Sequence, residues 1–313
     1  MDRPIFDRRA IPSDARLTEW HAPDGWALRR FDWPGSGRGS ILFQGGRGDI
    51  IEKYLESFEH WHAQGWSVTA FDWRGQGGSG RLARNSRVGH IDDFGTYIAD
   101  LKAFWADWSA TAQGPRVLMG HSMGGHLVLR ALAEGAVDPD AVVLIAPMLG
   151  LHAPLGSAWV GERLARTLGG IGNSARPAWK QNEIPGTRSP RQKLLTHDIA
   201  RYDDEIWWKE ARPELLLGPP SWRWVIEAFK STRILRANRT LKSIRTPLLA
   251  LIADADLLVD PKLAARTVAK LPQARIVHFG KESAHEILRE ADPVRNRAIG
   301  EIDLFLAARA PRA

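Results

Sequence analysis

A glycine-rich run near the middle of the chain constrains the fold more than any other feature. It reads Gly-His-Ser-Met-Gly-Gly from Gly120 to Gly125, between a strand-like run at 116–119 and a helix-like run at 123–133. A serine at such a sharp strand-to-helix turn has strained backbone geometry, and small residues two positions away remove side chains that would clash with it. Its hydroxyl is then exposed at the carboxyl edge of a sheet, facing the N–H groups of the next helix. The run therefore predicts an α/β fold with Ser122 as a nucleophile.

The segments around this turn alternate between strands and helices. Two strands flanking a Pro-Asp-Gly turn at 23–25 read as a hairpin. The remaining alternation indicates βαβ units, and so a mostly parallel central sheet flanked by helices. The predicted strands are 17–21, 26–32, 40–44, 66–71, 116–119, 141–146, 247–253 and 275–279, and the predicted helices are 50–63, 91–108, 123–133, 261–270 and 294–308.

The alternation stops after Pro147 and resumes at Pro247. The segment between them has helix-like pieces, Pro/Gly breaks and six of the chain's 14 tryptophans. We interpret it as a helical insertion between two halves of one sheet. The expected organisation is an N-terminal part of the core at 1–148, the insertion at 149–240, and a C-terminal part of the core at 241–313.

The positive charge of the chain is concentrated in this insertion. Residues 150–239 hold 15 Lys/Arg and 9 Asp/Glu, so they account for most of the net charge of +7. A solvated surface is the simplest explanation, and attraction to an anionic head group or membrane surface is the alternative. The chain has no lysine/arginine cluster or nucleic-acid motif, so we expect no nucleic-acid partner.

The ends and the apolar runs of the chain bear on its location. The N-terminal residues have mixed charge and no apolar core of signal-peptide length follows them. No run approaches the ~18–20 apolar residues that a membrane span needs. We therefore expect a cytoplasmic protein, and the basic insertion also fits peripheral contact with the inner face of the membrane.

A serine nucleophile needs a base that takes its proton and a carboxylate that orients this base. In folds of this kind the chain order is Ser, then Asp or Glu, then His. Only His278 and His285 follow the late acidic cluster. His278 lies inside the predicted strand 275–279, where a packed or sheet-face role is expected. His285 lies in the loop after this strand and can reach Ser122, so we predict that it is the base.

Three carboxylates follow the strand at 247–253 and compete for the role of the acid. They are Asp254, Asp256 and Asp260. Each could accept a hydrogen bond from the imidazole, so chemistry alone leaves the choice open. Asp260 precedes Pro261 and also suits the N-cap of a helix. Because the chain has no cysteine, a cysteine nucleophile and thiolate metal sites are excluded.

These motifs together resemble the lysophospholipase and monoacylglycerol lipase branch of the α/β-hydrolases, which is also grouped as serine aminopeptidase-like. Besides the turn at Ser122, the Asp-Trp-Arg-Gly-Gln-Gly-Gly-Ser-Gly run at 72–80 is similar to the family's D-x-R-G-x-G-x-S loop. The run Ala-His-Glu at 284–286 matches the family's histidine segment. The run at 255–260 resembles the segment in which the first Asp is the acid, and this selects Asp256.

The resemblance extends to the insertion and to the oxyanion hole. The runs at 194–198, 213–215 and 218–224 are similar to bacterial lysophospholipase-like members, which implies a cap over the active site. Many relatives have His-Gly after the third strand, where this chain has Gln-Gly-Gly-Arg-Gly at 44–48. The resemblance implies that the backbone N–H groups of Met123 and Arg47 hold the oxyanion, with Gly46 as the alternative to Arg47.

The function that the resemblance implies is hydrolysis of an acyl ester through an acyl-enzyme, with a lysophospholipid or monoacylglycerol as substrate. No metal or organic cofactor is needed. Four tryptophans of the insertion are candidates for contact with the substrate: Trp207, Trp208, Trp222 and Trp224. The competing functions are a general short-chain carboxylesterase, a peptidase or amidase, and an acyltransferase. A non-catalytic binding protein of this fold is the least favoured, since it would be expected to lack one of the three residues Ser122, Asp256 and His285.

Overall fold

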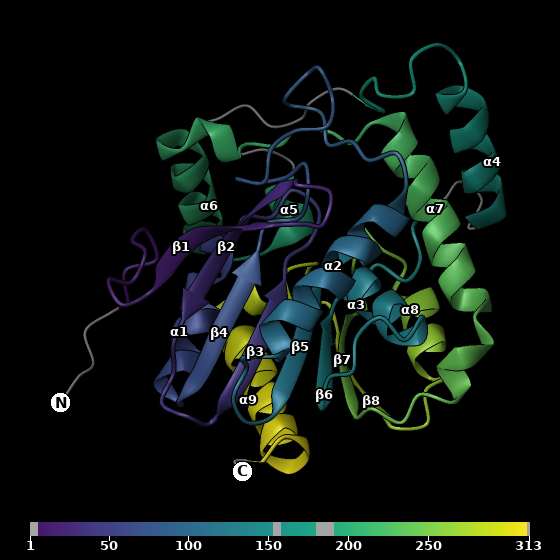
Figure 1. Cartoon of the computed structure of the whole chain (residues 1–313). Helices are drawn as coiled ribbons and strands as arrows, with labels where there is room; N and C mark the ends of the chain where they lie inside the picture. The colour runs from purple at the N-terminus through teal and green to yellow at the C-terminus, as the bar shows by residue number, and fades with distance from the viewer. Residues whose placement is uncertain (1–5, 153–157, 180–190, 312–313) are drawn as a thin grey trace.

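A computed structural model describes residues 6–152, 158–179 and 191–311. In this part of the chain, eight strands form one sheet in the order β1-β2-β4-β3-β5-β6-β7-β8 (Figure 1). The β1–β2 and β2–β4 pairs are antiparallel and all other neighbouring pairs are parallel. This confirms the mostly parallel central sheet. The strands are β1 (Arg16–His21), β2 (Ala27–Trp33), β3 (Gly39–Gln44), β4 (Trp66–Phe71), β5 (Arg116–His121), β6 (Ala141–Ile145), β7 (Leu248–Ala253) and β8 (Ala274–Phe279).

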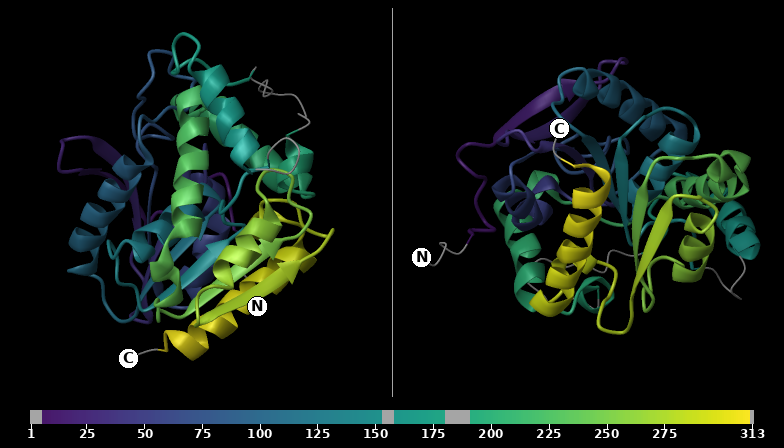
Figure 2. Two further views of the ribbon diagram at one scale, coloured as in Figure 1. Left: turned by 90° about the vertical axis from the view of Figure 1, so that its right-hand side faces the viewer. Right: turned by 90° about the horizontal axis from the view of Figure 1, so that it is seen from below.

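Helices cover both faces of the sheet. α1 and α9 pack on one face, and α2, α3 and α8 pack on the other (Figure 2). Because both faces are covered, the central strands β6 and β7 are apolar throughout and every residue in them is buried. These helices are α1 (Leu55–Ala63), α2 (Phe94–Ser109), α3 (Met123–Ala133), α8 (Pro261–Val268) and α9 (Asp292–Arg309), with short 3-10 turns η1 (Ile51–Tyr54) and η5 (Ile287–Arg289).

Side-chain caps set two of the helix starts. The predicted helix at 91–108 begins later in the structure, at Phe94, because the Asp93 side chain accepts a hydrogen bond from the N–H of Gly95 and caps it there. Asp260 accepts a hydrogen bond from the N–H of Leu263 at the start of α8. Asp260 is therefore a helix cap.

The segment between β6 and β7 is helical in the part that the structure describes. In Figure 1 its helices occupy the upper part of the molecule above the sheet, and α7 packs along α4 and runs down one side. None of the helices described is long and apolar enough to cross a membrane. The elements of this segment are α4 (Ala158–Gly169), α5 (Gln192–Leu195), α6 (Ile199–Ala211), η3 (Pro213–Leu215), α7 (Trp222–Ala237) and η4 (Arg239–Lys242).

Candidate active site

Ser122 occupies the turn between β5 and α3 in a strained conformation. Its φ is 52° and its ψ is −117°, a region that a residue with a side chain rarely adopts. Two glycines let the chain turn this tightly. A Cβ atom on Gly120 would lie 2.7 Å from the carbonyl carbon of Gly124, and one on Gly124 would lie 2.4 Å from the carbonyl oxygen of Gln44. The turn thus holds the serine where β3 and β5 end.

Three side chains meet at this turn. The hydroxyl oxygen of Ser122 lies 2.8 Å from Nε2 of His285, and Nδ1 of His285 lies 2.5 Å from Oδ2 of Asp256. All three residues are buried. The second carboxylate oxygen of Asp256 accepts hydrogen bonds from the N–H groups of Leu258 and Val259, at 2.8 and 3.1 Å. The loop after β7 therefore fixes the carboxylate, which in turn orients the imidazole.

The charges of this pair stabilise each other. Burial alone would raise the pKa of Asp256, but the adjacent His285 and the two backbone N–H groups outweigh it, so the pKa lies below its ordinary value. Burial alone would lower the pKa of His285, but Asp256, assisted by Glu286 and Asp49, raises it. Asp256 is therefore ionised at neutral pH, and Nδ1 of His285 carries the proton that faces it. Nε2 is left free to accept a proton from Ser122.

The other candidates for the base and the acid lie elsewhere. Asp254 and His278 pair with each other on the surface, at 2.8 Å, with about half of each side chain exposed. His278 is thus on the outer face of the edge strand β8. Of the three carboxylates that chemistry left open, only Asp256 reaches His285.

The loop after β3 presents backbone N–H groups beside Ser122. The N–H of Gly46 donates to Oδ2 of Asp49 at 2.6 Å, and the N–H of Gly48 donates to Oε1 of Gln76 at 2.6 Å. The N–H of Gly46, the alternative oxyanion donor, is therefore already bound to Asp49. Among the residues described, none accepts a hydrogen bond from the N–H of Arg47 or of Met123.

A buried group of charges holds this loop in place. Oδ2 of Asp49 also accepts a hydrogen bond from the Tyr54 hydroxyl at 2.5 Å and lies 3.1 Å from Nδ1 of His121. The ammonium of Lys53 forms ion pairs with both Asp49 and Glu286. Burial would raise the pKa of Asp49, but Lys53 and His121 hold it well below its ordinary value. One lysine therefore connects the loop after β3 to the residue next to His285.

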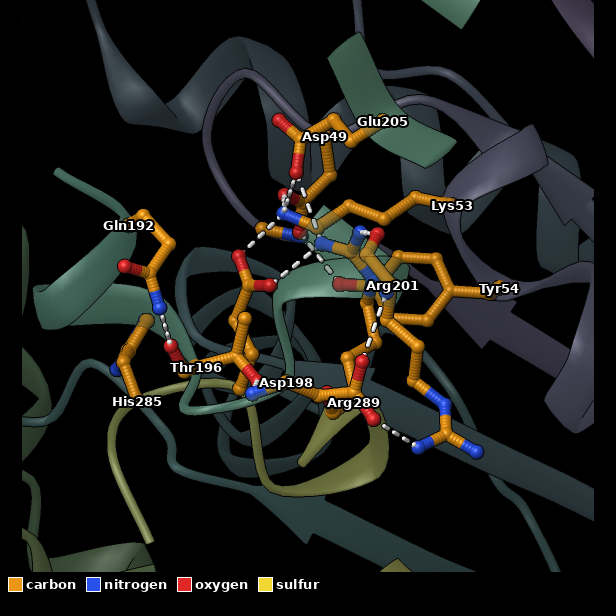
Figure 3. A network of polar contacts seen from close by, with 12 residues as sticks. Asp49, Lys53, Tyr54, Gln192, Thr196, Asp198, Arg201, Glu205, His285 and Arg289 are labelled. Carbon is orange, nitrogen blue, oxygen red and sulfur yellow. Dashed lines mark hydrogen bonds and ion pairs between the residues drawn. The ribbon is translucent and has the colours of Figure 1, made fainter. Parts of the chain in front are cut away.

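The same group extends to α6 of the insertion (Figure 3). Glu205 on α6 lies 3.3 Å from the Lys53 ammonium and 2.8 Å from the Arg289 guanidinium, which also contacts Glu286 at 2.6 Å. The backbone N–H of Glu286 donates to the carbonyl of Leu195, at the end of α5, at 2.7 Å. The insertion is thus anchored beside the histidine loop. No motif signals these residues, because they lie far apart along the chain and meet only in the fold.

A cavity of about 310 Å³ opens beside Ser122 and His285. Residues of the insertion form much of its wall, and the core contributes the loops after β3, β5, β6, β7 and β8. One side is apolar. The apolar wall includes Met148, Leu151, Trp179, Leu194, Leu195, Leu217, Pro219, Pro220, Trp224, Leu258 and Val259. In the described part of the chain, no cluster of three or more His, Cys, Asp or Glu side chains could hold a metal ion.

Comparisons with known proteins identify the family of this chain. A model of the hydrolase family described as serine aminopeptidase, S33, matches residues 17–292. The chain belongs to this family. It is 31% identical over 249 residues to lysophospholipase L2 of Escherichia coli K12, covering 72% of this chain and 68% of that protein. It is 28% identical over 225 residues to phospholipase YtpA of Bacillus subtilis, covering 71% and 76%.

Solved structures show the same fold. Monoglyceride lipase of Saccharomyces cerevisiae superposes with a TM-score of 0.75 at 18% identity, covering 97% of this chain and 99% of that one. The monoacylglycerol lipase of Paleococcus ferrophilus gives a TM-score of 0.68 at 22% identity, covering 90% and 98%. This member of the serine aminopeptidase S33 family therefore has the α/β-hydrolase fold that its motifs predicted.

The structure corrects three of the four tryptophan assignments in this family member. Trp224 lines the cavity, but Trp207, Trp208 and Trp222 do not. Trp208 is buried and its indole N–H donates to the carbonyl of Arg8, Trp207 packs edge-on against Trp208, and Trp222 packs against Arg176. Trp207 and Trp208 lie on a side of α6 that is turned towards the N-terminal segment. Trp179, which no helical spacing singles out, lies in the cavity wall instead.

Proposed function

We propose that this hydrolase cleaves the acyl ester of a lysophospholipid or monoacylglycerol, with Ser122 as nucleophile, His285 as base and Asp256 as the acid that orients it. The observation that carries the proposal is the continuous contact from Ser122 through His285 to Asp256, opening into a cavity with an apolar wall. The relatives described as lysophospholipases and the fold shared with monoacylglycerol lipases support this substrate class.

The reaction proceeds in two steps. Nε2 of His285 takes the proton of the Ser122 hydroxyl as the oxygen attacks the ester carbonyl carbon, and the imidazolium then gives this proton to the leaving glycerol oxygen. A water molecule loses a proton to the same nitrogen and attacks the acyl-enzyme. The fatty acid leaves as Ser122 regains its proton. Asp256 stabilises the imidazolium in both steps.

The N–H groups of Arg47 and Met123 are the proposed oxyanion donors. Two observations support them. The N–H groups of Gly46 and Gly48, on either side of Arg47, donate to Asp49 and Gln76, while the N–H groups of Arg47 and Met123 have no acceptor among the described residues. Each such donor contributes ~3–4 kcal/mol to stabilising the transition state. The histidine that many relatives carry before this position is not needed for these bonds.

Residues 149–240 act as a cap in this proposal. Their helices form much of the cavity wall, and they are anchored beside His285 by Glu205 and by the backbone contact to Leu195. An acyl chain bound at Ser122 would lie between this cap and the core.

We propose peripheral membrane contact through exposed apolar side chains of the cap. α4 and the residues after it expose Trp159 and Ile171, each by more than 60%, and Trp179, which also lies in the cavity wall. The guanidinium of Arg163 lies over the Trp159 ring. Exposed aromatic and aliphatic side chains next to arginines suit an anionic lipid surface. Co-sedimentation with vesicles of phosphatidylglycerol should exceed that with phosphatidylcholine and should weaken in Trp159→Ser. Equal binding to both vesicles would refute the contact.

The substrate is tested by a panel. Hydrolysis of a lysophospholipid, a monoacylglycerol, p-nitrophenyl esters of graded chain length and a peptide p-nitroanilide is compared in the wild type and in Ser122→Ala. We expect Ser122-dependent cleavage of the two lipids above that of the short esters and of the anilide. Activity confined to short esters would identify a short-chain carboxylesterase, and preferred cleavage of the anilide would identify a peptidase or amidase.

A further inference from the structure

The cavity contains an arginine, Arg47, whose side chain the proposed reaction does not use. Arg47 supplies its backbone N–H to the proposed oxyanion hole, while the residue lines the same cavity as Ser122 and Trp224. The guanidinium carbon lies 5.5 Å from the centroid of the Trp224 ring, and Nη2 donates a hydrogen bond to the carbonyl of Gly218. The side chain is thus held in one place by the cap.

No anion in the described part of the chain neutralises this guanidinium. Its Nε is buried and has no hydrogen-bond partner among these residues. The two carboxylates of the cavity, Asp49 and Glu286, are both paired with Lys53. A buried, charged donor without an acceptor is costly, so the position favours binding of an anion.

A second arginine adds to the positive charge of the cavity. Arg191, next to α5, lines the cavity as well, and its guanidinium also lies 3.7 Å from Oε1 of Glu205. Burial and, after it, the charge of Arg191 lower the pKa of Arg47 to about 9. Arg47 is therefore still protonated at neutral pH, and an anion placed beside it would relieve the repulsion between the two arginines.

The surrounding backbone leaves room for the guanidinium. A Cβ atom at position 89 would lie 2.9 Å from Nη2 of Arg47, so the glycine found there avoids a collision. Two backbone hydrogen bonds fix Gly89. Its N–H donates to the carbonyl of Pro219 at 3.0 Å, and its carbonyl accepts from the N–H of Ser221 at 2.8 Å. Core and cap together therefore define this position.

We propose that the Arg47 guanidinium, with Arg191 beside it, is an anion subsite that binds the phosphodiester of a lysophospholipid while its acyl ester lies at Ser122. This inference rests on the proposed function and deepens it. The N–H of Arg47 would hold the carbonyl oxygen of the ester. The side chain of the same residue would hold the phosphate, which glycerol joins to that ester. Guanidinium groups bind phosphate oxygens through paired, charge-assisted hydrogen bonds. A monoacylglycerol has no charge to offer, so Arg47 would set the preference between the two lipids.

The test compares two lipids with the same short acyl chain, both monomeric in solution: a lysophosphatidylglycerol and a monoacylglycerol. The quantity measured is the ratio of two kcat/KM values, that for the lysophosphatidylglycerol divided by that for the monoacylglycerol. Arg47→Met keeps the backbone N–H and removes the charge, and we expect the ratio to fall by about 10- to 100-fold. Arg47→Lys should restore part of it, and Gly89→Ala, which displaces the guanidinium without changing Arg47, should lower it.

Arg38→Met is the matched control. The Arg38 guanidinium also lies over a tryptophan ring, that of Trp66 at 5.0 Å, but it is outside the cavity, so its loss should leave the ratio unchanged. A purely structural role of Arg47 would lower both activities together and leave the ratio constant.

The outcomes separate the two proposals. Hydrolysis of neither lipid by the wild type would refute the proposed function. Hydrolysis of both with an equal ratio in the wild type and Arg47→Met would refute only the subsite. Inorganic phosphate provides the remaining arm, as an inhibitor of p-nitrophenyl ester hydrolysis. Inhibition that depends on Arg47, together with an unchanged lipid ratio, would assign the subsite to a free anion and overturn the head-group assignment.

Discussion

Replacing Asp256 by asparagine should inactivate the enzyme while leaving the fold intact. Oδ1 of Asp256 accepts two backbone hydrogen bonds, from Leu258 and Val259, so the amide oxygen of the asparagine will keep this position. The amide NH₂ must then face Nδ1 of His285, which was 2.5 Å from a carboxylate oxygen. An NH₂ group cannot accept the Nδ1 proton, so the imidazole carries its proton on Nε2 instead. It can then no longer take the proton of Ser122.

The magnitude follows from this change of tautomer. The corresponding substitution in a Ser-His-Asp triad lowers kcat by ~10⁴, which is about 5.5 kcal/mol of transition-state stabilisation at 1.36 kcal/mol for each factor of ten. Hydrolysis of a p-nitrophenyl ester gives kcat, and the urea midpoint checks the fold. Asp254→Asn is the control, because Asp254 also pairs with a histidine, His278, but on the surface. It should change kcat by less than about 2-fold. A larger loss in Asp254→Asn than in Asp256→Asn would refute the assignment of the acid.

Two further predictions concern pH and the buried charges. Asp256 raises the pKa of His285 above its ordinary 6.5. Protonation of His285 as the pH falls should therefore reduce kcat/KM with a midpoint above pH 6.5, and Asp256→Asn should lower this midpoint. A wild-type midpoint well below pH 6.5 would contradict the pairing of His285 with Asp256. Arg289→Met should leave Glu205 and Glu286 short of a cation and lower the free energy of unfolding by about 3–5 kcal/mol. In urea unfolding, Arg212→Met, which removes an exposed ion pair with Glu214, should cost only about 0–1 kcal/mol. Equal losses in both variants would refute a stabilising role for the buried group.

The contact between Ser122 and His285 was predictable because local sequence carries the geometry of both. The strand, the glycines and the helix around Ser122 are contiguous, and His285 follows from the order of elements along the chain. The acid was harder to predict. Asp254 and Asp256 are two residues apart and chemically alike, and the resemblance to a family was needed to separate them. In the structure Asp254 lies on the surface with His278, and Asp256 turns inward because two backbone N–H groups bind its carboxylate.

The positions of the tryptophans and of the buried charges could not be predicted, and the reason is different. Which side of α6 faces Ser122 depends on how the insertion packs, so Trp207 and Trp208 turned towards the N-terminal segment instead. The charges of Lys53, Glu205 and Arg289 meet from three distant segments. Surface exposure is the ordinary expectation for each of them taken alone. Only the three-dimensional arrangement shows that they are buried and paired.

Ser122 is the proposed nucleophile, activated by His285, and covalent labelling tests this assignment without any substrate. A fluorophosphonate should add one phosphonyl group to the intact protein, and peptide mass spectrometry should place it on Ser122. Labelling should be lost in Ser122→Ala and slowed strongly in His285→Gln. It should be unchanged in His278→Gln, the surface histidine with an aspartate partner of its own. Undiminished labelling of Ser122→Ala, or an adduct on another residue, would show that Ser122 is not the nucleophile.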